Sequence, residues 1–136
     1  RAAGWQALGV DLNPLAVRGQ IVGGISMGIG FALMEELDVR GCVPRNQNFD
    51  KYQMMRARDL PDIVSIIVED GEKTGPYGAI GIGEPPTIPV APAILNAIKN
   101  AVGVRFFNTP ATSRRILAAL KEGAARPDGK GWDLPR

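Results

Sequence analysis

The longest apolar stretch of the chain covers residues 21–34, which read IVGGISMGIGFALM and carry no charge. The Asn13-Pro14 pair upstream is a helix start signal, so the pattern predicts a helix. Because the stretch is apolar on nearly all sides, it is typical of a helix buried inside a larger structure. Its 14 residues are fewer than the roughly 18 to 20 that cross a bilayer, and we expect no membrane-spanning helix.

Glycines make this predicted helix unusual. Gly23, Gly24, Gly28 and Gly30 interrupt it, and each costs about 1 kcal/mol relative to Ala in a helix interior. Two arrangements offset such a cost: a neighbouring backbone packed closely on the glycine face, which is the commoner, or a ligand lying on that face. Gln20, at the entrance of the helix, is placed to offer its amide to a polar group there.

The remaining patterns predict a few further elements and two irregular segments. Residues 63–68 hold five branched apolar residues in a run of six, which indicates a buried strand. Elsewhere we expect a polar loop at 40–51, a helix at 89–102 stopped by Gly103, a short strand at 104–107, a helix from Thr109-Pro110 to Gly123, and an extended tail at 124–136 that lies over a partner through Trp132.

Three helices and few strands indicate an α+β fold class. Two lone strands do not make a stable sheet, so the fold is expected to be an incomplete mixed domain, completed by an upstream segment or a partner chain. The first residue is Arg, and we therefore also expect the chain to be a fragment or a processed piece. We assign residues 1–123 to one domain segment and 124–136 to the tail.

The composition of the chain excludes several kinds of metal and catalytic site. The chain has no His and one Cys, so these residue types cannot supply a zinc site or a Ser–His or Cys–His nucleophile pair. A net charge of +2 without a dense basic run gives no argument for nucleic acid. We expect Cys42 to be buried, and its lack of a disulfide partner fits a reducing, cytoplasmic location.

Residues 75–86, reading GPYGAIGIGEPP, are the strongest candidate for chemistry. Four glycines in nine residues let a large ligand approach the backbone, and Pro85 and Pro86 stiffen the segment that follows Glu84. A carboxylate fixed in such a loop can act as a general base. By spacing alone, an exposed turn with a solvated Glu is the commoner reading. A phosphate-binding loop is disfavoured because no Lys-Ser/Thr follows the glycines.

Several separated blocks then occur in an order that matches one family. The chain strongly resembles the C-terminal part of the molybdenum-binding subunit in the xanthine oxidase and aldehyde oxidoreductase family of molybdenum hydroxylases, over roughly residues 9 to 120. The blocks are Asn13-Pro14, Gly19-Gln20, Gly23-Gly24, residues 27–30, Ala32-Leu33, Glu35-Glu36, residues 75–79, residues 81–86, residues 92–94, residues 96–98, residues 103–105 and Pro110.

The resemblance implies roles for individual residues. Glu84 matches the family's catalytic base, the backbone of Ile80, Gly81, Ile82 and Gly83 would line the cofactor, and Gln20 matches a glutamine that contacts it. No residue of this chain is expected to bind the metal itself. Two positions depart from the family: Ile80 stands where many members carry Lys or a small residue, and Arg18 where an acidic residue is common.

The resemblance also implies the wider assembly. The cofactor would be molybdenum bound to molybdopterin cytosine dinucleotide, with two [2Fe–2S] clusters and FAD on partner domains or subunits. The partners would be the remainder of the molybdenum subunit, an iron–sulfur subunit and a flavin subunit. The substrate would be an aldehyde or an N-heteroaromatic molecule, with water as the oxygen source. The alternative is a non-catalytic assembly segment of a larger complex.

Overall fold

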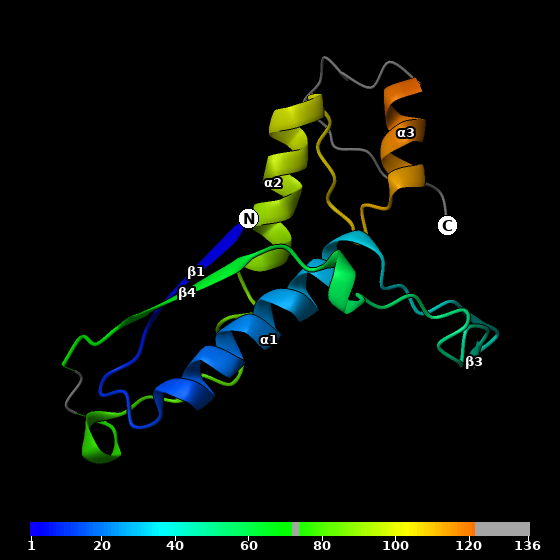
Figure 1. The fold of residues 1–136 in the computed structure, drawn as a ribbon. Coiled ribbons are helices and arrows are strands. Elements are labelled where there is room, and N and C mark those ends of the chain that lie inside the picture. The colour runs from blue at the N-terminus through cyan, green and yellow to red at the C-terminus, as the bar shows by residue number, and fades with distance from the viewer. Residues whose placement is uncertain (72–73, 122–136) are drawn as a thin grey trace. The chain divides into compact units, whose positions relative to one another are not determined.

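The computed structural model describes residues 1–71 and 74–121, and within them the chain has three α-helices and a few short strands (Figure 1). The α+β fold class predicted from the sequence is confirmed. Contacts divide the chain into two units. Unit 1 comprises Arg1–Gly28 and Arg56–Pro89, and unit 2 comprises Ile29–Met55 and Val90–Arg136.

Unit 1 is built on a parallel pair of strands, β1 (Ala2–Ala7) and β4 (Ile63–Val68), with Ala2 opposite Ile63 and Ala7 opposite Val68. The strand predicted at 63–68 is therefore confirmed, but it is half-buried and not buried, because one face of the sheet is open in the described residues. Helix α1 (Pro14–Leu33) lies along one face of this sheet. It approaches closely because Gly4 has no side chain: a Cβ there would stand 2.7 Å from Ile25 Cδ1.

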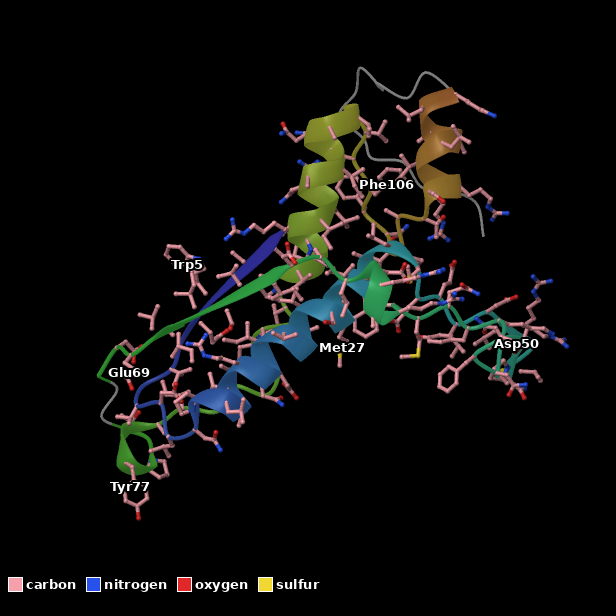
Figure 2. All side chains as sticks on the ribbon, in the orientation of Figure 1. Trp5, Met27, Asp50, Glu69, Tyr77 and Phe106 are labelled. Atoms are coloured by element: carbon pink, nitrogen blue, oxygen red, sulfur yellow. The ribbon has the colours of Figure 1, made fainter. Side chains whose placement is uncertain are left out.

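The other face of the sheet is open in the described residues. Trp5 on β1 is 75% exposed, and Figure 2 shows its ring standing away from the strands. Val68, at the end of β4, is also exposed. Parallel sheets normally have both faces covered, so this unit has the form of a layer that packs against more protein.

Helix α1 begins where the Asn13-Pro14 signal predicted. The Asn13 side-chain oxygen accepts the backbone N–H of Ala16 at 3.1 Å and so caps the first turn. Within unit 1, the helix buries Val17, Ile21 and Ile25, which are one turn apart. At 20 residues α1 is long and apolar enough to cross a membrane by length and composition alone, a test that buried core helices also pass. The absence of a membrane span stays a prediction.

The helix glycines serve different purposes. A Cβ on Gly24 would stand 2.7 Å from Pro86 Cβ and 3.0 Å from Thr87 Oγ1, so close backbone packing explains this residue. Gly19 and Gly23 are exposed, and no described atom beyond the adjacent helix turns stands within 4 Å of where their Cβ would be. Close packing of a neighbouring backbone, which was the commoner of the two explanations, therefore accounts for Gly24. Gly19 and Gly23 of the same helix face open space instead.

In unit 2, the end of α1 is tied to the segment that follows it. The N–H groups of Met34 and Glu35 both donate to the Gly30 carbonyl at 2.9 Å. The Glu35 carboxylate folds back over Gly30, where a Cβ would collide with it, and accepts the Tyr52 hydroxyl at 2.9 Å. The single hydrogen bond between Tyr52 and Glu35 joins positions 17 residues apart in the sequence.

Residues 40–51, predicted as a polar loop, contain part of a small hairpin. Strands β2 (Val39–Arg40) and β3 (Val43–Pro44) pair antiparallel across Gly41 and Cys42, which both have positive φ. The expectation that Cys42 is buried is wrong, because the residue occupies the exposed tip of this turn. Asn46 fastens the hairpin, accepting the Asp38 N–H at 2.9 Å and donating to the Glu36 carbonyl at 2.7 Å.

The core of unit 2 includes α2 (Val90–Val102) and α3 (Ser113–Lys121), and its buried residues are Val104, Phe106, Ala111 and Ala119. Helix α2 agrees with the predicted helix at 89–102, and the Gly103 N–H closes it on the Lys99 carbonyl. Arg115 on α3 donates to the Pro110 carbonyl at 2.7 Å and to the Glu36 carboxylate at 2.9 Å.

Two expectations about these elements were wrong. Residues 104–107 form no strand: Phe106 makes a single β-bridge, and Val104 and Phe106 are buried in the core of unit 2. Helix α3 starts at Ser113 and not at Pro110, because the Ala111 N–H donates to Ala32 and Thr112 supplies the cap. Strand β4 pairs with β1 of the same chain, and the resulting two-stranded sheet agrees with the predicted incomplete mixed domain. The end of the predicted third helix and the tail at 124–136 lie outside the described residues, and the assignment of residues 1–123 to one domain segment stays a prediction.

Neighbouring glycines on α1 offer a matched test of the packing against Pro86. Gly24→Ala places a Cβ against a rigid proline ring, and overpacking of this kind lowers the free energy of unfolding by about 1–3 kcal/mol. Gly23→Ala meets open space and gains helix propensity, so it raises the free energy of unfolding by up to about 1 kcal/mol. Urea unfolding of the purified variants measures both. Equal effects at the two positions would contradict the structure.

The bond between Tyr52 and Glu35 predicts a pH dependence. The hydrogen bond to Glu35, with partial desolvation and the carboxylate charge, raises the pKa of Tyr52 above its ordinary 10.0. The stabilisation is therefore present below about pH 10 and is lost as the pH rises through the raised pKa. The chain has two tyrosines, so a spectrophotometric titration of Tyr77→Phe reports Tyr52 alone. Adding Glu35→Gln should lower the Tyr52 pKa; an unchanged titration would exclude this hydrogen bond.

Candidate functional site

The glycine-rich segment 75–86 lies wholly in unit 1 and starts with a tight turn. The N–H groups of Gly78 and Ala79 donate to the carbonyls of Gly75 and Pro76 at 2.9 and 3.0 Å. This turn needs Gly75, because a Cβ there would collide with the Ala79 carbonyl oxygen. The turn, η2 (Pro76–Gly78), is attached to the start of the chain by the Val10 N–H, which donates to the Gly78 carbonyl at 2.7 Å.

Glu84 stands at the start of a second turn. Its carbonyl accepts the Thr87 N–H at 3.0 Å, and the Pro85 carbonyl accepts the Ile88 N–H at 3.3 Å. Pro86 is buried in the contact with Gly24 on α1. The backbone around Glu84 is thus held by a turn and by a proline seated on a helix, while its side chain is exposed.

The Glu84 carboxylate is available for contact. No hydrogen-bond donor or cation among the described residues engages it. A carboxylate whose backbone is fixed and whose oxygens are free is suited to accept a proton or a hydrogen bond from a bound molecule. The local arrangement therefore permits a role as general base, and by itself also permits a solvated surface residue.

The predicted cofactor-contacting residues lie immediately before Glu84. No described atom beyond the adjacent residues stands within 4 Å of where a Cβ would be on Gly81 or Gly83. Neither glycine has a positive φ, so their small size is required neither by packing within the described chain nor by their φ. Ile82 is half-buried and Ile80 is 44% exposed. Backbone amides in this stretch can be approached closely by a ligand, because no side chain stands on either glycine.

Gln20 is exposed on α1. It lies four residues before Gly24, which is about 6 Å along the helix axis and on the same side of the helix. Because Gly24 carries the contact with Pro86, Gln20 belongs to the part of α1 that borders the Glu84 turn. Gly19 and Gly23, which flank Gln20 on the helix surface, are open as well. Unit 1 thus holds all the predicted site residues on two segments joined by one contact.

The structure also identifies residues that sequence reasoning did not assign to the site. Gly24, Pro86 and Thr87 form the joint that positions the Glu84 turn, and Gly75 shapes the turn before it. The adjacent prolines and the glycine-rich helix were visible signals, but nothing in the sequence alone paired them. Among the described residues, no three His, Cys, Asp or Glu side chains are grouped so as to hold a metal ion.

Comparison with known proteins places the chain in a sequence family. Residues 1–61 match the family model of the molybdopterin cofactor-binding domain. Over 107 residues the chain is 48% identical to the xanthine dehydrogenase molybdenum-binding subunit of Escherichia coli O157:H7, an alignment that covers 77% of this chain and 14% of that subunit. Over 115 residues it is 38% identical to the aldehyde oxidoreductase of Megalodesulfovibrio gigas, covering 84% of this chain and 12% of that protein.

A comparison with solved structures agrees with the sequence relatives. The chain superimposes on the quinoline 2-oxidoreductase of Pseudomonas putida 86 with a TM-score of 0.81 and 28% identity, covering 88% of this chain and 16% of that one. The chain spans less than a fifth of the length of each of these three proteins. The resemblance seen in the motifs is confirmed, and the chain belongs to the family of the molybdenum-binding subunits of xanthine dehydrogenases and aldehyde oxidoreductases.

Proposed function

We propose that this chain supplies the catalytic base and part of the cofactor wall of a molybdenum hydroxylase, with Glu84 as the base. The observation that carries the proposal is the contact of Pro86 and Thr87 with Gly24, which fixes the Glu84 turn beside the part of α1 that bears Gln20. Family membership supports the proposal, since related proteins carry names of molybdenum-dependent oxidoreductases.

The residues present fit a molybdopterin cofactor. Such a cofactor is large and polar and needs N–H donors at close range, which the exposed backbone around Gly81 and Gly83 can provide. The open helix surface at Gly19 and Gly23 leaves room for a large group, and the Gln20 amide beside it offers both a donor and an acceptor. When bound, the cofactor supplies the oxidation of the substrate, with an oxygen atom that comes from water.

Each protein residue has a limited task in this proposal. Glu84 accepts a proton at a carboxylate oxygen, from the group that attacks the substrate. Pro85 and Pro86 restrain the turn, so the backbone that carries the Glu84 carboxylate stays in one position. The backbone of Ile80, Gly81, Ile82 and Gly83 donates hydrogen bonds to the cofactor, and Gln20 orients it from the helix side. The redox chemistry belongs to the cofactor, and the chain contributes position and electrostatics.

The remaining parts of the enzyme are proposed on family grounds. We propose an aldehyde or an N-heteroaromatic substrate, molybdopterin cytosine dinucleotide as the cofactor form, and electron transfer to two [2Fe–2S] clusters and FAD on partner domains or subunits. The remainder of the molybdenum subunit would cover the open sheet face that bears Trp5. A cytoplasmic location also stays a prediction, resting on the use of a single cysteine.

Replacement of the base tests the catalytic proposal directly. Glu84→Gln keeps the shape of the side chain but removes its ability to accept a proton. We expect turnover of every substrate of the native complex to fall by about 10²- to 10⁴-fold, the usual contribution of a general base. Molybdenum content should stay unchanged, as measured by elemental analysis of the purified complex.

A matched control separates loss of the base from loss of charge. Asp62→Asn removes another exposed carboxylate of unit 1 and should leave turnover near that of the unmodified complex. Near-normal activity in Glu84→Gln would refute the catalytic role. A native complex without molybdenum would favour the alternative, a non-catalytic assembly segment.

The glycines before the base test the cofactor wall. Gly81→Val and Gly83→Val add side chains that meet no described atom of the chain within 4 Å at the Cβ position, so the melting temperature of the complex depleted of cofactor should change little. If the cofactor lies against this backbone, the same changes should lower the molybdenum bound per complex several-fold. Full molybdenum occupancy in both variants would place the cofactor elsewhere.

A further inference from the structure

One end of unit 1 exposes apolar side chains around two carboxylates. Val10 is 41% exposed, Leu12 62%, Leu15 83% and Tyr77 88%. We call these four residues, with Asp11 and Glu69, the Asp11 surface. Figure 2 shows Tyr77 projecting from the end of its turn, and Glu69 at the end of β4 in the same unit.

Two hydrogen bonds join the segments of the Asp11 surface. The Val10 N–H donates to the Gly78 carbonyl at 2.7 Å, which joins the Tyr77 turn to the segment that leads into α1. The Asp11 N–H donates to Glu69 Oε1 at 2.9 Å, which joins that segment to the end of β4. Tyr77 has φ 56 and ψ 18, a backbone region that non-glycine residues seldom adopt, so the turn presents this exposed ring from a constrained position. These two hydrogen bonds tie the Tyr77 turn and the end of β4 to the segment that leads into α1.

The charges of the Asp11 surface are not balanced within the described chain. Asp11 Oδ1 is shielded from solvent and accepts no hydrogen bond, and no described cation forms an ion pair with Asp11 or Glu69. Asp70, next in the sequence, is exposed and adds to the negative charge. The exposed carboxylates of Glu69 and Asp70 leave this end of the unit negatively charged, and a basic side chain brought by a partner would form charge-assisted hydrogen bonds with the accessible carboxylate oxygens.

We propose that the Asp11 surface is covered by an arginine- or lysine-bearing segment of the remaining molybdenum-subunit polypeptide. The cation pairs with the carboxylates of Asp11 and Glu69, and apolar neighbours of that cation cover Leu12, Leu15 and Tyr77. The negative charge of the Asp11 surface favours a positively charged segment as its occupant. The source is the same subunit, because most of the length of the related Escherichia coli subunit lies outside the aligned region. This inference rests on the proposed membership of a molybdenum subunit and adds a contact to it.

A cross-linking experiment on the native complex identifies the occupant. A photoreactive benzoylphenylalanine replaces Tyr77, whose exposure allows the larger ring, and irradiation is followed by peptide mass spectrometry. We expect a cross-linked peptide from the molybdenum-subunit polypeptide outside residues 1–136, with Arg or Lys within a few residues of the linkage. A linkage to another subunit, to a second copy of this chain or to a peptide without a basic residue overturns the proposal, as does the absence of any product.

A second measurement removes the charge of Asp11 and follows hydrogen exchange. Asp11→Asn preserves the size of the side chain and should speed hydrogen exchange of the cross-linked segment about tenfold, as loss of a charge-assisted hydrogen bond gives. Asp62→Asn, on an exposed carboxylate elsewhere in unit 1, should leave that exchange unchanged. Equal exchange in the Asp11→Asn and unmodified complexes overturns the proposal. Molybdenum content, measured on the same samples, reports separately on the proposed function.

Discussion

The contact between Gly24 on α1 and Pro86 with Thr87 is the constraint on which the candidate site depends. Gly24 cannot carry a side chain without displacing its neighbours, since a Cβ there would stand 2.7 Å from Pro86 Cβ. The glycine lies in an apolar helix and the proline pair follows Glu84, so the two are far apart in the sequence. Their contact joins these two segments. The same contact seats the segment that follows Glu84 on helix α1.

This joint explains why glycines of similar appearance have different roles. Gly24 and Gly4 admit close neighbours, whereas Gly19, Gly23, Gly81 and Gly83 leave space that the described chain does not fill. Helix propensity alone would favour Ala over Gly at positions 19 and 23. Because packing within the described chain does not require glycine there, a group outside the chain is a candidate reason. A cofactor lying on these glycines is the explanation consistent with family membership, and it remains a proposal for this chain.

The same unit presents surfaces that need other protein. A two-stranded parallel sheet covered on one face, with Trp5 exposed on the other, is typical of a layer within a larger domain. The Asp11 surface adds an unpaired carboxylate oxygen at one end of the unit. Both features agree with the small share of its relatives' length that the chain spans.

The sequence by itself determined the elements with strong local signals: α1 from its apolar run and Asn13 cap, β4 from its branched residues, α2 from its Gly103 stop, and the family from its ordered motifs. It did not predict β1, since AAGWQA has no apolar alternation, or the late start of α3, where Ala111 bonds to Ala32. Only the tertiary structure decided these, and the joining of Gly24 to Pro86, because each depends on contacts between residues far apart in the chain, which local pattern does not encode.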